Sequence, residues 1–114
     1  MVEVTLYREN NLYFGFKSTG HADYGDSEYD IVCAGVSILT QTLYFQAINN
    51  LGIAEEDIYD EQDSGYLKII FKNKSDYKKM QDSFLFLKEG ISLLEKNYSE
   101  HVMLKVDNNS QEVG

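Results

Sequence analysis

One cysteine and one nearby histidine are the side chains best suited to chemistry in this sequence. Cys33 follows His21 by twelve residues, and most of the interval is polar and contains Gly25. A thiol beside an imidazole is the smallest set for nucleophilic acyl transfer, because the ring removes the thiol proton and later protonates the leaving amine. Taken alone, the pair is weak evidence for such a site. The position of Cys33 by itself favours a cysteine buried as a small apolar filler, and His21 also fits a histidine on a surface loop.

The position of Cys33 is typical of the start of a helix. From Asp30 the chain is apolar at helical spacing, so Asp30 is a candidate N-cap and Gly52 a candidate stop. Cys33 would then be the third helical residue, where unpaired N–H groups and the macrodipole favour a thiolate. In that geometry the backbone N–H groups of Cys33 and Ala34 are candidates to hold a developing oxyanion.

The polar residues around this pair each have two readings. Asp30 either caps the helix or turns toward His21, where a carboxylate orients the ring and stabilises the imidazolium. Ser37, one turn after Cys33, either hydrogen-bonds within the site or bonds back to the Cys33 carbonyl. The second histidine, His101, begins an outer strand and is expected to be structural.

Composition narrows the class of protein. The 114 residues suit one domain, and 43% apolar with 25% charged residues is ordinary for a globular chain. A net charge of −9 argues against direct nucleic-acid binding. It is compatible with a basic polypeptide partner, and equally with a charge that only keeps the protein soluble. The sequence contains no purely apolar run of about 18 residues, so we expect no membrane span. Its first residues lack the pattern of a secretory signal. The lone cysteine suits a reducing cytoplasm. Zinc ligands are too few, so we expect no metal and no cofactor.

The remaining chain predicts an α+β scaffold. Alternating apolar and polar residues predict strands over 2–8, 12–18, 57–60, 66–72 and 102–106. Apolar residues every three or four positions predict helices from Asp30 to Leu51 and from a Ser75 cap to Tyr98. The order β-β-α-β-β-α-β predicts a two-layer domain, with a mostly antiparallel sheet and two helices on one face.

Domain bounds and helix burial follow from the same patterns. We expect one catalytic domain over residues 1–106 and a disordered tail over 107–114. The first helix is apolar on nearly every side, which predicts that it is largely buried. One strip at helical spacing is more polar, and it consists of Cys33, Ser37, Gln41 and Tyr44.

Residues 19–37 resemble the ribosomal-processing cysteine protease (Prp) family. The resemblance is carried by Thr-Gly-His-Ala at 19–22 and Asp-Ile-Val-Cys-Ala-Gly-Val-Ser at 30–37, with the same separation of histidine and cysteine. It implies a thiol endopeptidase in which His21 is the base and Cys33 the nucleophile. Gly20, Asp30 and Ser37 match supporting positions of the family.

The resemblance also implies a substrate and a partner. Such enzymes remove an N-terminal extension from a large-subunit ribosomal protein, number twenty-seven, after an aromatic pair, and so support ribosome assembly. They form homodimers, and a long loop orders over the substrate. The loop residues here are Ala22, Asp23, Tyr24, Gly25 and Tyr29, with both tyrosines taken as exposed contacts for the aromatic pair.

Two other functions remain open at this point. One is a ribosome-assembly module that binds the same protein without cutting it. The other is a redox-responsive thiol protein, although the chain has no second cysteine to resolve an oxidised Cys33.

Overall fold

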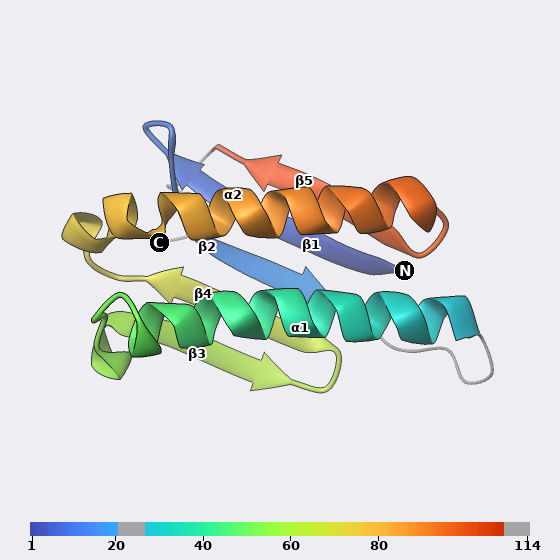
Figure 1. Cartoon of the computed structure of the whole chain (residues 1–114), viewed down its shortest axis with the longest axis horizontal. Helices are drawn as coiled ribbons and strands as arrows, with labels where there is room; N and C mark the ends of the chain where they lie inside the picture. Colours follow the sequence, from blue (N-terminus) through green and yellow to red (C-terminus); the bar gives the residue numbers. More distant parts are fainter. Residues whose placement is uncertain (21–26, 109–114) are drawn as a thin grey trace.

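A five-stranded sheet with both helices on one face makes up the protein (Figure 1). The computed structural model describes residues 1–20 and 27–108. The elements, in chain order, are β1 (Val2–Glu9), β2 (Leu12–Thr19), α1 (Ser27–Asn49), the 3₁₀ turn η1 (Glu55–Asp57), β3 (Ile58–Asp63), β4 (Tyr66–Phe71), α2 (Lys74–Asn97) and β5 (Val102–Asp107). The predicted two-layer α+β architecture and its element order are confirmed.

The sheet has the strand order β3-β4-β2-β1-β5. All neighbours are antiparallel except β1 and β5, which run parallel. Glu9 pairs with Leu12 across a two-residue turn in which Asn10 and Asn11 have φ of 52° and 66°. Asparagine tolerates this left-handed conformation, which two-residue hairpin turns require. This hairpin sets β2 in the centre of the sheet, and β2 leads directly toward the predicted histidine.

The core lies between the sheet and the helices. Alternate residues of β1 point into it, and Val4 and Leu6 are fully buried. The helical stripe predicted for α2 is also confirmed, with Met80, Phe84 and Ile91 fully buried. The helices touch closely, because a Cβ added at Gly90 would lie 2.7 Å from Leu39 Cδ1.

Helix α1 differs from its prediction in two ways. It begins at Ser27, three residues before Asp30, so Asp30 lies in the first turn and the proposed N-cap role is wrong. Its outer side is open to solvent, since Ile31, Ile38 and Phe45 are 51%, 66% and 52% exposed. The prediction of a largely buried helix is therefore wrong: only the side facing the sheet and α2 is covered.

Other boundaries shift by a few residues. The N-cap of α2 is Asn73 rather than Ser75, and its side chain makes no capping hydrogen bond. Strand β5 continues through Asp107, so the sheet includes the first residue of the predicted tail. Residues 109–114 of that tail lie outside the described residues.

By length and composition alone, α1 also passes as a membrane-spanning helix, because it has 23 residues and contains an 18-residue window with a mean hydropathy of 1.5. A core helix of a water-soluble domain meets the same criterion. Here Val32, Val36, Leu43 and Ala47 are buried within the hydrophobic core. The apolar character of α1 is thus accounted for in part by this packing.

Candidate active site

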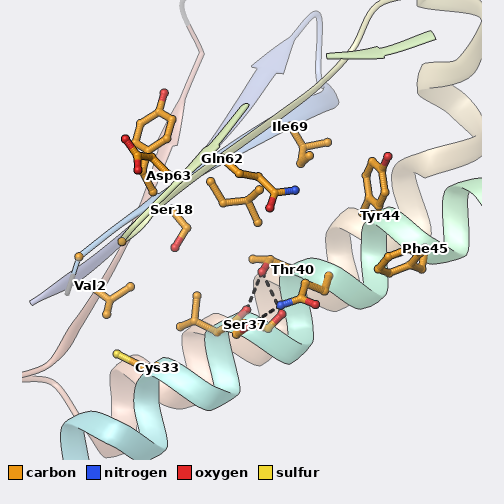
Figure 2. Close-up of a pocket in the computed structure, with 16 residues that line it drawn as sticks. Val2, Ser18, Cys33, Ser37, Thr40, Tyr44, Phe45, Gln62, Asp63 and Ile69 are labelled. Atoms are coloured by element: carbon orange, nitrogen blue, oxygen red, sulfur yellow. Dashed lines mark hydrogen bonds between the residues drawn. The ribbon is translucent and has the colours of Figure 1, made fainter. Parts of the chain in front are cut away.

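A pocket of about 440 Å³ separates α1 from the sheet and contains Cys33 (Figure 2). From α1 it is lined by Cys33, Val36, Ser37, Thr40, Gln41, Tyr44 and Phe45. The predicted polar strip of α1 is therefore the helical wall of this pocket. The opposite wall comes from β1, β2 and the β3–β4 hairpin, segments distant in sequence that the strand order brings together.

Cys33 is partly buried and is the seventh residue of α1. The macrodipole acts mainly within the first turn, so the helix end contributes less to a thiolate here than a third position would. In a helix, N–H groups beyond the first four bond to the carbonyl four residues earlier. The N–H groups of Cys33 and Ala34 are therefore engaged within α1, and the predicted oxyanion role would require other donors.

Gly20 directly follows β2 and borders the pocket, immediately before the predicted base. Its N–H donates to the Gly65 carbonyl at 2.9 Å. Its φ of +140° suits glycine, and an added Cβ would lie 2.7 Å from Met1 O and 2.8 Å from Val2 Cα. The backbone around Gly20 is thus tightly fixed. His21, Ala22, Asp23, Tyr24 and Gly25 lie outside the described residues.

Asp30 and Ser37 share the side of α1 that carries Cys33. Asp30 is exposed and precedes Cys33 by three residues, a spacing that places both on one helix face. Ser37 Oγ accepts a hydrogen bond of 2.6 Å from the Gln41 amide, and both residues line the pocket. The bond back along the helix is instead made by Thr40 Oγ1, which donates to the Val36 carbonyl at 2.8 Å.

Tyr29 is not an exposed loop residue. It lies in the first turn of α1 and is only 2% exposed, with its ring edge-on to His101 at 5.6 Å between centroids. His101 Nε2 lies 3.5 Å from the Glu28 carboxylate. The predicted exposure of Tyr29 is therefore wrong, whereas its contact with substrate stays a prediction. Instead, Tyr29 and His101 join the start of α1 to the turn before β5.

The residues that form the sheet wall of the pocket were not predicted as site residues from the sequence. Tyr66 was predicted only as a strand residue, and Asp63 was not among the candidate site residues, yet both border the pocket. Burial, together with the hydrogen bond of 2.9 Å that it donates to Glu61, raises the pKa of Tyr66 to about 12. Burial likewise raises the pKa of Tyr44, and Asp60 and Glu55 add to the effect. Both phenols are thus neutral at physiological pH.

The electrostatic character of the pocket is neutral to acidic. Among the described residues that line it, Asp63 is the only carboxylate, and none is Lys or Arg. Over residues 1–20 and 27–108, no group of three His, Cys, Asp or Glu side chains is arranged to hold a metal ion. The described side chains therefore suit an uncharged or basic ligand rather than an anion.

Comparison with known proteins places this arrangement among cysteine proteases. The family model described as cysteine protease Prp matches residues 1–103. No curated protein sequence matches significantly. The structure of SMU.848 from Streptococcus mutans is 28% identical, with a TM-score of 0.84, over 96% of this chain and 99% of that one.

Two further structures show the same fold. They are of an essential ribosomal processing protease Prp from S. aureus, one with a substrate peptide and one with a covalently linked product peptide. Their TM-scores are 0.77 and 0.76 at 22% and 23% identity, over 94% of this chain and 100% of each of those chains.

Proposed function

Because the chain belongs to the cysteine protease Prp family, we propose that it is an endopeptidase that removes the N-terminal extension of a large-subunit ribosomal protein, number twenty-seven. The observation that supports this most is the partly exposed Cys33 in a pocket between helix and sheet. We assign the nucleophile to Cys33 and the base to His21, with Gly20, Asp30 and Ser37 in support. The dyad itself rests on the sequence motif.

The chemistry requires two steps. The Cys33 thiolate attacks the scissile carbonyl, and the imidazolium of His21 then gives its proton to the leaving amine, which leaves an acyl-enzyme. The same ring next takes a proton from water, whose oxygen attacks the thioester and releases the second product. Asp30, on the Cys33 side of α1, is our candidate to orient the imidazole.

The charge of the chain fits such a substrate. Ribosomal proteins are basic, whereas this chain carries −9 and its pocket holds Asp63 without a basic side chain among the described residues. Opposite charges raise the encounter rate with a basic substrate, whereas the negative charge of the chain disfavours contact with RNA, which is also negative. We accordingly propose a cytoplasmic protein with a polypeptide substrate and no nucleic-acid partner.

Mass spectrometry of the ribosomal protein after incubation with this chain tests the function. We expect the substrate to lose one N-terminal peptide, with the new end after an aromatic pair. A control substrate lacking the extension should keep its mass. An unchanged mass with retained binding would favour the non-enzymatic assembly module. An unchanged mass without binding would contradict both the endopeptidase and the assembly module.

We further propose that two copies pair through the exposed helix face, defined as Ile31, Ile38, Phe86 and Leu93. These side chains are 51%, 66%, 73% and 61% exposed. The two isoleucines are seven residues apart on α1, and Phe86 and Leu93 are seven residues apart on α2. Residues seven apart share a helix face, and exposed apolar patches of this kind commonly mark interaction sites.

Sedimentation velocity should therefore report twice the chain mass of 13.1 kDa for the unmodified protein. Ile38→Lys combined with Phe86→Lys should yield monomers, because each lysine would be buried twice in a symmetric interface. The matched control is Met103→Lys, at a 37% exposed residue on β5. Monomers in the unmodified protein, or dimers in the double variant, would contradict this interface.

A further inference from the structure

The pocket that contains Cys33 extends well beyond the thiol. It follows α1 from Cys33 to Tyr44 and Phe45, with Thr40 between them (Figure 2). Eleven residues at 1.5 Å each separate Cys33 from Tyr44, a span of about 17 Å along the helix axis. A ligand that fills the pocket from the thiol outward therefore reaches far past the reacting bond.

The length of the pocket sets how far a peptide bound along it reaches. An extended chain advances about 3.3 Å per residue, so about five residues cover the distance from Cys33 to the far end. The side chain that meets Tyr44 and Phe45 then lies four to six residues from the scissile bond.

The far end has the chemistry of an apolar subsite. The rings of Tyr44 and Phe45 stand edge to face, 5.2 Å apart at 84°. Phe45 is 52% exposed, so half of its surface is available to a ligand. Asp60 and Glu55 lie close enough to Tyr44 to act on it electrostatically, and they would repel an acidic side chain. An aliphatic or aromatic side chain gains most from covering these rings.

We infer that Tyr44 and Phe45 form a distal specificity subsite that binds an apolar substrate side chain four to six residues from the scissile bond. This inference rests on the proposed endopeptidase function and adds a determinant remote from the thiol. A contact that is equally strong in the ground state and in the transition state lowers KM without raising kcat. Loss of the subsite should thus appear mainly in KM.

A peptide scan with a matched variant tests the subsite. The probe is a peptide with ten residues on each side of the bond cleaved in the ribosomal protein, with each residue replaced in turn by serine. One apolar position four to six residues from that bond should lower kcat/KM about tenfold when replaced. In the Phe45→Ala enzyme the same replacement should change kcat/KM less than twofold, because the contact is already gone.

The control variant is Met103→Ala, at a residue that is 37% exposed on β5, lies outside the proposed dimer face and does not line the Cys33 pocket. It should retain the full tenfold discrimination. The inference would be overturned if discrimination persisted in Phe45→Ala, if it disappeared equally in Met103→Ala, or if it were absent beyond three residues from the bond.

Binding separates this inference from the proposed function. Fluorescence anisotropy with the Cys33→Ala chain and the labelled parent peptide measures Kd without cleavage. We expect Phe45→Ala in that background to raise Kd about tenfold and Met103→Ala to leave it unchanged. This result would stand even if the wild-type chain cut nothing, whereas an unchanged Kd in Phe45→Ala would reject the subsite whether or not cleavage occurs.

Discussion

Replacing Cys33 by alanine should lower kcat/KM for the extension peptide at least about a thousandfold, since no other group can form the acyl intermediate. His21→Ala should cause a loss of the same order, because the thiol would lack its base. The two losses should not add in the double variant, as expected for residues that act as one unit. Initial rates of peptide cleavage, followed by mass spectrometry, measure all three.

Folding must be unchanged for this result to concern catalysis. Cys33 is only partly buried, so its alanine variant should unfold within about 1 kcal/mol of the parent in urea. Ser37→Ala is the matched control on the same face of α1, and we expect its kcat/KM to fall no more than about tenfold. Cleavage retained by either the Cys33 or the His21 variant would reject the dyad.

The redox alternative makes a different prediction for the same thiol. A reactive thiolate should be alkylated by iodoacetamide well below the pH at which free cysteine reacts, and His21→Ala should move that profile toward free cysteine. If Cys33 is alkylated at low pH to the same extent with and without His21, and the chain has no peptidase activity, redox sensing would be favoured. A profile like that of free cysteine would argue against both thiolate functions.

The fold was predictable because its signals are local. Alternation in β1 and the stripe of Met80, Phe84 and Ile91 in α2 define which faces are buried, and burial of those faces leaves few ways to assemble two layers. The start of α1 was not predictable by this route. Residues 27–29 read as polar loop, and the helix includes them where Tyr29 packs against His101, more than seventy positions later.

In the candidate site, too, the local features were predictable and the long-range ones were not. The helical wall of the pocket could be predicted from the spacing of Cys33, Ser37, Gln41 and Tyr44, because helical periodicity alone puts them together. The sheet wall depends on β4 lying beside β2, a long-range pairing that no local pattern reveals. The exposure of Ile38 and Phe45 could not be predicted either, because apolar composition does not show which face of a helix other elements cover.

Replacing Gly20 by alanine should impair catalysis more than it impairs folding. The added Cβ would lie 2.7 Å from Met1 O and 2.8 Å from Val2 Cα, both backbone atoms that cannot rotate away. We expect the free energy of unfolding to fall by about 1–3 kcal/mol, the usual range for a strained backbone position. We expect kcat/KM to fall about a hundredfold, as can happen when a reacting group is displaced by 1 Å.

The reason for the larger catalytic effect is the position of Gly20 in the chain. Its N–H is held by the Gly65 carbonyl at 2.9 Å, and the next residue is the predicted base. A shift forced at this point moves the attachment of His21 relative to Cys33 on α1. The strain can be relieved by a small backbone movement, whereas proton transfer requires hydrogen-bond distance and has no such tolerance.

Gly52→Ala separates the two effects. Gly52 also has a positive φ, of +71°, but nothing lies within 4 Å of an added Cβ, and it follows the far end of α1. Its alanine variant should lose about 1 kcal/mol of stability from backbone strain alone and keep kcat/KM within twofold. Urea unfolding and peptide cleavage, measured on both variants, distinguish a general loss of stability from a displaced base. Equal catalytic losses in the two variants, or full activity in Gly20→Ala, would mean that the end of β2 does not position the histidine.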